Sequence, residues 1–322
     1  MKLLKDSEYR TFEQLCGLTQ GSVHATMIKY LKSKYTTVVS TNDYTYAVGD
    51  IPIALVAHMD TVFKFPADEV FYDRQKNVMW SPNGLGADDR AGVFAIIQII
   101  KKGLRPHIIL TTDEEIGARG AYQLSAIDCP FKDLRYIIQL DRRGSNDCVF
   151  YDCNNPQFTD YIETFGFVEA IGSFSDISVI CPAWKVAGVN LSIGYRDEHS
   201  ISEVLFVGHM LSTIDKVCRM LQEKDIPHFE YIPAMYHNYW MKYYLNHGDD
   251  THCRHCKREF LPEELILVKS AEGDIQPWCI DCISGNVEFC SCCGDAYEVT
   301  KDPKNTFNMC EDCYYDTLYD YK

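Results

Sequence analysis

The chain has 322 residues and a net charge of −15, and its 46% hydrophobic and 24% charged residues disfavour extended disorder and fibrous architectures. The acidic excess disfavours nucleic acid and an anionic membrane surface as partners, because both are bound by Lys and Arg surpluses. No apolar run approaches the ~18 residues that span a bilayer, and the N-terminus lacks a secretory signal, so we expect a cytoplasmic protein.

The first 225 residues alternate between predicted helices and strands. The nearly all-apolar run from Ile51 to Ala57 is typical of a strand buried on both faces. Residues Val93, Ile96, Ile97 and Ile100 recur at helical spacing and predict a helix packed on a sheet. In chain order, the other predicted elements are helices at 11–17 and 22–33, strands at 36–40, 45–48, 107–112, 136–140, 148–151 and 189–193, and a helix at 207–221. This order predicts a three-layer α/β sandwich with a mainly parallel central sheet.

The composition changes after this part of the chain. Aromatic residues accumulate between 226 and 249, and nine of the 15 cysteines lie after residue 250. We therefore predict a first domain at 1–225, a connector at 226–249 and a cysteine-rich domain at 250–322. The connector is expected to pack on one or both domains, because a flexible linker would be polar or rich in Gly and Ser. A partner-binding strip is the alternative.

Short acidic or histidine-bearing motifs follow the predicted strands of the first domain. In open α/β sheets, ligand crevices form at the carboxyl ends of the strands. Alone, each motif has an ordinary structural explanation, such as a packed histidine or an aspartate that caps a helix. Together they predict a site for two divalent metals, zinc first, with manganese or cobalt as substitutes. The motifs are His58-Met59-Asp60, Gly86-Ala87-Asp88-Asp89, Asp113-Glu114-Glu115, Asp141 and His199.

These motifs carry a resemblance to a known family. The segments 54–62, 84–93, 112–121 and 194–203 resemble, in order and spacing, the dizinc exopeptidases related to peptidase T and glutamate carboxypeptidase. The resemblance runs from about residue 11 to 221 and implies two catalytic zinc ions. It implies His58 and Asp141 as ligands of one zinc, Glu115 and His199 as ligands of the other, and Asp88 as the bridge between them.

The same resemblance implies a mechanism. Glu114 corresponds to the general base, Asp60 to the carboxylate that orients the ligand histidine, and the peptide bond after Asp88 to a cis bond. The implied activity is zinc-dependent hydrolysis of amide bonds, most simply by an exopeptidase of the aminopeptidase type acting on peptides. A carboxypeptidase, an amidohydrolase of N-acyl amino acids and a non-catalytic binding protein on a hydrolase scaffold are the alternatives.

The sequence departs from the peptidase T pattern in two places. Only 57 residues separate Asp141 from His199, which leaves no room for a lid domain of ~50 or more residues beside the core elements. The compact zinc aminopeptidases share this plan, and Ser175-Asp176 stands where they keep a Ser-Asp pair. The second departure is Arg142-Arg143, which either holds a substrate carboxylate or forms a surface pair among acidic groups.

The tail contains four Cys-x-x-Cys pairs in an acidic setting. Gaps of 22 and 16 residues within its two halves suit two structural zinc sites with four cysteines each, resembling tandem treble-clef or LIM-like fingers. A crossed, RING-like pairing is the alternative. With 16 acidic and 7 basic side chains from Asp249 to Lys322, recognition of a protein partner is expected rather than of DNA, although a purely stabilising cap is equally consistent. The predicted ligands are Cys253, Cys256, Cys279, Cys282, Cys290, Cys293, Cys310 and Cys313.

Overall fold

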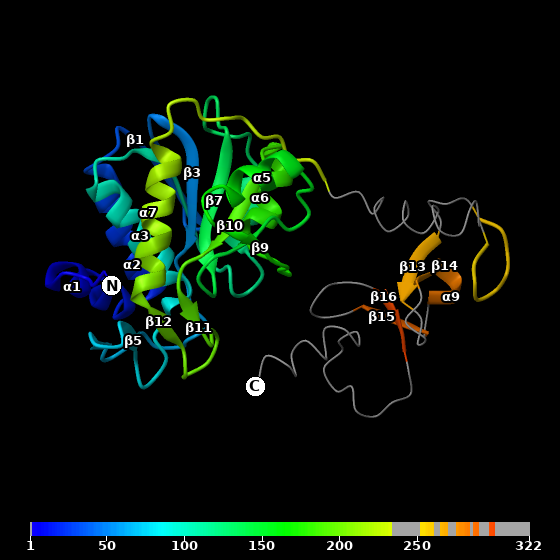
Figure 1. Ribbon diagram of the computed structural model, residues 1–322, viewed down its shortest axis with the longest axis horizontal. Coiled ribbons are helices and arrows are strands. Elements are labelled where there is room, and N and C mark those ends of the chain that lie inside the picture. The colour runs from blue at the N-terminus through cyan, green and yellow to red at the C-terminus, as the bar shows by residue number, and fades with distance from the viewer. Residues whose placement is uncertain are drawn as a thin grey trace. The chain divides into compact units, whose positions relative to one another are not determined.

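The structure, a computed structural model of the full chain, describes residues 2–233, 252–260, 265–269, 275–283, 286–289 and 296–299 (Figure 1). The chain forms two compact units, Met1–Pro233 and Ala234–Lys322. Cys290, Cys293, Cys310, Cys313 and residues 234–249 of the predicted connector lie outside the described residues. None of the helices in the described ranges has the length and apolar character that crossing a bilayer requires.

Every helix and strand predicted for the first unit is present, and further short helices and strands lie between them. Its helices are α1 (Asp6–Cys16), α2 (Gln20–Lys32), α3 (Ala87–Lys101), α4 (Arg119–Ser125), α5 (Pro156–Glu163), α6 (Asp176–Trp184) and α7 (Val207–Leu221). Its strands are β1 (Thr37–Ser40), β2 (Tyr44–Val48), β3 (Ile51–His58), β4 (Phe71–Asp73), β5 (Val78–Trp80), β6 (Pro106–Thr111), β7 (Tyr136–Arg142), β8 (Asp147–Val149), β9 (Val168–Glu169), β10 (Gly188–Ser192), β11 (Tyr195–Arg196) and β12 (Val204–Phe206).

The first unit is built on an eight-stranded sheet with the order β1-β2-β6-β3-β7-β10-β8-β9. The central strands β6, β3, β7 and β10 are parallel neighbours. On one side β2 pairs with β6 and β1 with β2, and on the other β8 pairs with β10, all in antiparallel orientation. The predicted α/β fold is confirmed, with a parallel centre inside a mixed sheet.

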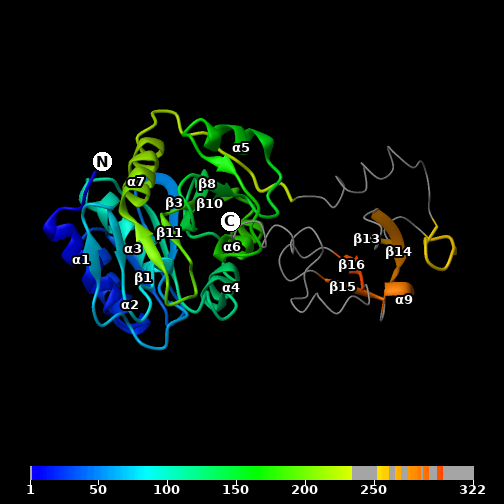
Figure 2. The ribbon, with the colours of Figure 1, turned by 60° about the horizontal axis from the view of Figure 1, so that its bottom comes forward.

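Strand β3 shows why helices cover both faces of this sheet. Ile53 and Leu55 are fully buried in a core to which α1, α3 and α7 contribute, whereas Ala54 and Val56 are fully buried in a second core with α4 and α6. Successive side chains of a strand point to opposite faces, so an all-apolar strand needs a cover on each side. Figure 2 shows α4 and α6 on one side of the sheet and α1, α3 and α7 on the other.

Helix α3 is covered all round. Every residue from Val93 to Ile100 is buried, so the predicted apolar stripe is one side of a helix without an exposed face there. On its outer side Phe94 meets Phe12 of α1 edge to face, with ring centroids 5.6 Å apart. Asp88 and Asp89, near the start of α3, have non-helical φ and ψ angles and lead directly into this buried part of the helix.

A second, four-stranded sheet was not predicted. Its order is β11-β12-β5-β4, and its neighbours are antiparallel. Each strand has only two or three residues, and Val204 pairs with Trp80 from a distant part of the chain, so the sequence offers no local signal. This sheet joins the loop 197–203 to the segment that leads into α3.

The last residues of the first unit pack on its main sheet. Phe229 is buried against Phe158 and Tyr161, with ring centroids 4.8 Å and 5.2 Å away. Its N–H donates to the carbonyl of Arg135, and its carbonyl accepts from the N–H of Ala187. The first aromatic residue after position 225 therefore belongs to the core of the first unit.

His107, at the start of β6, provides a pH-dependent contribution to stability. Its Nδ1 accepts the N–H of Gly49 at 3.0 Å, its ring stacks on Phe131, and burial lowers its pKa from 6.5 to about 4. The folded state therefore keeps this imidazole neutral, whereas the unfolded chain binds a proton below pH 6.5. The resulting stabilisation is complete above pH 6.5 and is lost as the pH falls toward 4, by up to about 3 kcal/mol. The free energy of unfolding is measured by urea unfolding of the chelated chain at pH 7 and at pH 4.5. It should fall less between these two pH values in His107→Gln than in wild type. An equal fall would contradict the assigned role of His107.

The described part of the second unit contains β13 (Leu265–Lys269), β14 (Ile275–Cys279), α9 (Ile280–Ile283), β15 (Val287–Phe289) and β16 (Ala296–Glu298). Its sheet has the order β14-β13-β16-β15. Trp278 and Cys279 end β14 and lead directly into α9.

Candidate metal centre

Strand register brings two of the predicted ligands to one edge of the main sheet. His58 is the last residue of β3 and pairs with Thr111, the last residue of β6. Val56 pairs with Gln139 of β7, and two residues further along these parallel strands His58 and Asp141 stand level. Glu114 and Glu115 follow the end of β6 at the same edge, as predicted for the carboxyl ends of parallel strands.

Five of the predicted residues form two clusters that share one carboxylate. His58 Nε2 lies 3.0 Å from Asp88 Oδ1 and 3.4 Å from Asp141 Oδ1. His199 Nε2 lies 3.3 Å from Asp88 Oδ2 and 3.0 Å from Glu115 Oε2. Within each cluster the three ligand atoms lie within 4.8 Å of one another. The two oxygens of Asp88 thus face different histidines, which is the arrangement that a bridging ligand requires.

The chemistry of the clusters fits divalent cations. Asp88, Asp141 and Glu115 crowd three carboxylates into a largely buried space, and Glu115 Oε1 is buried without a hydrogen-bond partner among the described residues. Buried carboxylates need a compensating positive charge. Imidazole nitrogen and carboxylate oxygen are donors that suit zinc, with manganese and cobalt as substitutes. The residues present therefore fit a pair of such ions.

The titration of the clusters reflects their mutual charges. Burial opposes protonation of His58, yet the carboxylates of Asp141, Asp60 and Asp88 raise its pKa well above 6.5. Hydrogen bonds that His199 donates to the carboxylates of Asp88 and Glu115 raise its pKa to about 11. Both shifts have the same cause, which is the crowding of carboxylates around each imidazole.

Asp60 connects the histidine of one cluster with the loop of the other. Its Oδ1 lies 3.2 Å from His58 Nδ1, which leaves Nε2 to face Asp88 and Asp141. Its two oxygens also accept the N–H groups of Glu114 and Glu115, both at 3.0 Å. Such a carboxylate fixes the tautomer and the orientation of a ligand imidazole.

Glu114 stands beside the clusters without contributing to either. Its neighbour Glu115 directs an oxygen at His199, whereas no atom of Glu114 belongs to the convergent ligand sets in the described chain. Burial raises the pKa of Glu114 to about 9, and the charges of Asp141 and Asp176 add to this effect while His58 opposes it. Of the two adjacent glutamates, Glu115 therefore belongs to a ligand cluster and Glu114 lies beside the clusters.

The structure adds residues around Asp141 that were not assigned from the sequence. Gln139 Nε2 and Ser175 Oγ donate to Asp141 Oδ2 at 3.1 Å and 3.0 Å, and the hydroxyl of Tyr195 donates to Oδ1 at 3.1 Å. Ser175 carried a signal through its place in the Ser-Asp pair. Gln139 lies two residues before Asp141, so the period of a strand could have identified it.

Glu203 forms hydrogen bonds to the segment that carries Asp88, the carboxylate shared by the two clusters. It is fully buried, and its two oxygens accept the N–H groups of Ala87 and Asp88, each at 3.0 Å. It also ends the loop that contains His199, which is joined to β5 through β12. One side chain thereby connects segments that hold two ligands of the second cluster.

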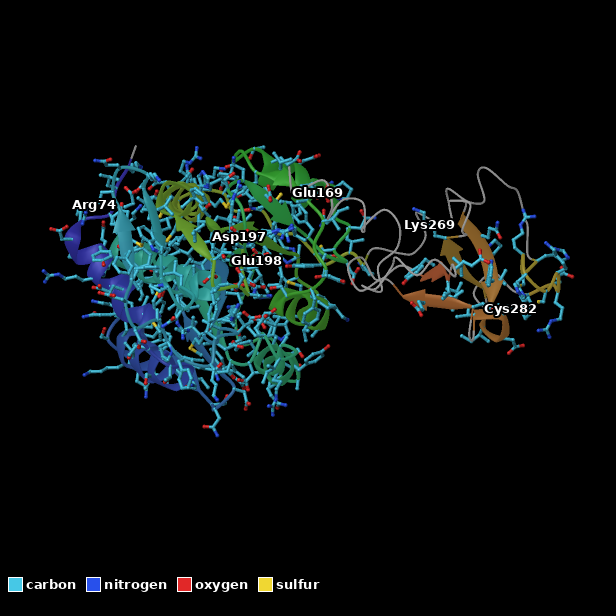
Figure 3. All side chains as sticks on the ribbon, turned by 90° about the horizontal axis from the view of Figure 1, so that it is seen from below. Arg74, Glu169, Asp197, Glu198, Lys269 and Cys282 are labelled. Atoms are coloured by element: carbon cyan, nitrogen blue, oxygen red, sulfur yellow. The ribbon has the colours of Figure 1, made fainter. Side chains whose placement is uncertain are left out.

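The two arginines after Asp141 have protein partners. Arg143 pairs with Glu198 at 3.2 Å, and Arg142 donates to the carbonyl of Ile171 at 2.9 Å. Figure 3 labels Glu198 on the loop between β11 and β12. Arg143 therefore forms an ion pair with an acidic group of the surface, which is one of the two interpretations that the sequence left open.

Solved peptidase structures share this architecture. Aminopeptidase PepT from Bacillus cereus superposes with a TM-score of 0.52 at 15% identity, over 67% of this chain and 97% of that one. A tripeptidase from Staphylococcus aureus gives 0.53 at 14% identity, over 69% and 99%. The TET aminopeptidase of a marine thaumarchaeon gives 0.55 at 15% identity, over 69% and 98%. The chain shares its fold with these peptidases. No protein-family model and no curated protein matches the sequence.

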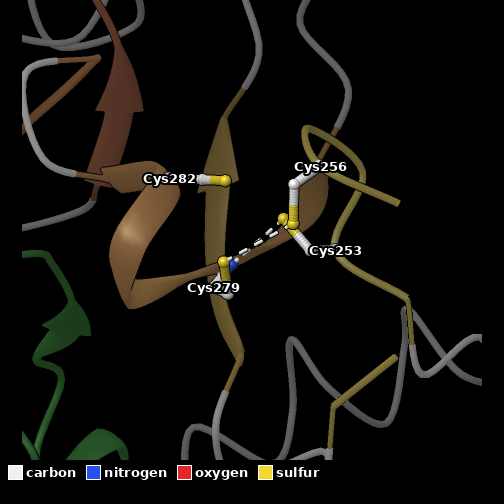
Figure 4. Close-up of side chains that lie close together, drawn as sticks. All are labelled: Cys253, Cys256, Cys279 and Cys282. Carbon is white, nitrogen blue, oxygen red and sulfur yellow. Dashed lines mark hydrogen bonds between the residues drawn. The ribbon is translucent and has the colours of Figure 1, made fainter. Parts of the chain in front are cut away.

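The described part of the second unit contains a separate cysteine cluster. Cys253, Cys256, Cys279 and Cys282 each bring a sulfur within 4.8 Å of the others (Figure 4). The Cys279 N–H donates to Cys253 Sγ at 3.3 Å, and Arg258 Nε donates to Cys256 Sγ at 3.4 Å. The first two Cys-x-x-Cys pairs thus come together in sequential order, which is not the crossed, RING-like pairing.

Proposed function

We propose that the protein is a zinc-dependent peptidase of the aminopeptidase type, with residues 1–225 as its catalytic domain. One observation carries this proposal: Asp88 directs one oxygen to His58 and the other to His199, so two three-residue clusters share one carboxylate. An acidic patch on the protein surface would not combine buried carboxylates with two histidines. The fold shared with solved aminopeptidases adds support.

His58 and Asp141 would hold one zinc ion, Glu115 and His199 the other, and Asp88 both. Bound there, the ions would acidify a water molecule and polarise the scissile carbonyl group. Asp60 keeps His58 oriented throughout.

Glu114 would accept a proton from the attacking water and deliver it to the leaving amine. Its pKa, about 9 beside the carboxylates alone, would fall once the clusters hold cations, because nearby positive charge favours the ionised form. Its carboxylate is available for this role because the ligand position is taken by Glu115.

The test uses the purified full chain with its metals. We expect about four zinc ions per chain, two in the peptidase clusters and two in cysteine sites. Mild chelation should remove the first two and abolish hydrolysis of a short-peptide library, and added zinc should restore it, with manganese or cobalt as weaker replacements. A zinc-loaded chain that hydrolyses no member of the library would instead favour the non-catalytic binding protein.

The same library separates the alternative activities. An aminopeptidase requires a free α-amino group, so peptides with an acetylated N-terminus should resist hydrolysis while those with an amidated C-terminus are cleaved. The opposite result would identify a carboxypeptidase. Release of acetate from acetylated amino acids would identify an amidohydrolase of N-acyl amino acids.

For residues 250–322 we propose a zinc-binding domain that recruits a protein partner or substrate. Its first site would use Cys253, Cys256, Cys279 and Cys282, whose sulfurs already converge. Sequential pairing of these cysteines leaves the two later pairs, 290/293 and 310/313, to form the second site. The acidic balance of this segment favours a basic protein surface over nucleic acid.

A further inference from the structure

A cavity of about 440 Å³ opens beside the candidate metal centre. The turn between α1 and α2, the loop after β3 and the loop after β6 enclose it, and Asp60 and Glu115 lie in its wall. Glu115 belongs to the cluster with Asp88 and His199, so a group in this cavity would approach that cluster from the side of Glu115. Cavities of this size are typical of small-ligand sites.

Two glycines fix the wall nearest to Asp88. A Cβ atom on Gly84 would lie 2.2 Å from the ring of Phe63, and one on Gly86 would lie 3.1 Å from the methyl group of Thr61. Both glycines have positive φ, a conformation that other residues rarely adopt. The Gly-x-Gly motif thus lets the loop after β3 pack closely on the start of α3, and Phe63 is held as part of the cavity wall.

The rim of the cavity is apolar and exposed. Val62, Phe65 and Ile116 all line it, with exposed fractions of 44%, 72% and 66%. Single exposed apolar residues are ordinary, but three around one cavity beside a candidate reaction centre indicate a surface that a ligand covers. Leu18 and Leu85 extend the apolar lining inward.

Several charged groups of the lining are already engaged within the protein. The Nη atoms of Arg90 donate to two backbone carbonyl groups, and its Nε is covered by protein atoms. Asp113 accepts from Gln20 at 2.9 Å, and Asp60 accepts two backbone N–H groups. These three groups shape the cavity rather than offer a charge to a ligand. Lys64 also lines the cavity, with its Nζ 5.4 Å from the ring centre of Phe65, so the rim presents apolar side chains and one lysine.

We propose that this cavity receives a large apolar side chain, aliphatic or aromatic, of the substrate residue that adjoins the hydrolysed bond. The proposal rests on the peptidase function proposed above and specifies its substrate class. Burial of several methylene or aromatic groups in such a cavity raises kcat/KM by roughly tenfold or more over alanine.

Kinetics with tripeptides test the proposal. In the series X-Ala-Ala and Ala-X-Ala, with X as Phe, Leu, Ala, Asp or Lys, one position should favour Phe and Leu over Ala by at least about tenfold. Val62→Ser and Phe65→Ser should remove most of this preference by lowering the rates for the Phe and Leu peptides. Val168→Ser is the matched control, because Val168 is 62% exposed on β9 and does not line the cavity.

Binding is measured separately, so that the result does not depend on turnover. Dissociation constants of the same peptides are determined by calorimetry on the zinc-loaded Glu114→Ala chain, with and without Val62→Ser. Tighter binding of Phe and Leu peptides that Val62→Ser weakens would support the cavity even if wild type hydrolysed nothing, which would refute only the peptidase function. Equal affinities and rates for Phe, Leu and Ala peptides, or equal effects of Val62→Ser and Val168→Ser, would overturn the proposal.

Discussion

Replacing Glu114 with alanine should leave both peptidase zinc ions bound and lower the rate of peptide hydrolysis by roughly 10²- to 10⁴-fold. Glu114 lies outside both convergent ligand sets of the described chain, so its removal takes no donor from the metals. The bond that it makes to Asp60 comes from its backbone N–H, which alanine retains, so the orientation of His58 is preserved. The measurements are kcat/KM on a cleaved peptide and zinc content per chain.

The adjacent residue provides the control. Glu115→Ala removes an oxygen that lies 3.0 Å from His199 Nε2 and should therefore lower zinc content as well as activity. If Glu114→Ala lost zinc while Glu115→Ala kept it, the two roles would be reversed. Hydrolysis by Glu114→Ala at the wild-type rate would rule out this residue as the general base.

Glu203→Gln is expected to weaken zinc binding and activity by roughly 10- to 100-fold, the range seen for groups that hold ligands in place. The carboxylate accepts two backbone N–H groups, one on each oxygen. In glutamine one oxygen becomes an NH₂ group, which faces an N–H donor and leaves it without an acceptor. An unsatisfied buried donor costs about 1–3 kcal/mol, so the start of α3 should shift and move Asp88 relative to His58 and His199.

Zinc affinity, measured by competition with a chromophoric chelator, distinguishes this positioning role from a general loss of stability. Glu198→Gln serves as the control, because Glu198 lies in the same loop and pairs with Arg143 at the surface, where ion pairs contribute little. We expect the control to keep its zinc affinity within about twofold of wild type. A Glu203→Gln chain that melts earlier but binds zinc as tightly as wild type would contradict the positioning role.

The periodicity of the sequence was sufficient for every strand of the main sheet except β9 and for the helices α1, α2, α3 and α7, whereas α4, α5 and α6 were not predicted. The apolar run of β3 requires cover on both faces, and the helical spacing from Val93 onward requires a helix, whatever their partners are. The strands β4, β5, β11 and β12 could not be predicted in this way. Two or three residues carry no period, and their stability comes from pairing with distant strands.

In the candidate site, too, some features follow from local sequence and others from tertiary contacts. The sequence by itself determined which side chains carry chemistry and that they follow parallel strands, because donor chemistry and strand ends are local properties. That Asp88 faces both histidines and that Glu115 rather than Glu114 meets His199 was implied by the family resemblance and by no local pattern, and the tertiary structure brings these groups together. Only the tertiary structure decided that Glu203 holds the start of α3. It also decided that the first four tail cysteines meet in sequential order. These choices depend on strand register and on contacts between segments far apart in the chain, which no local pattern encodes.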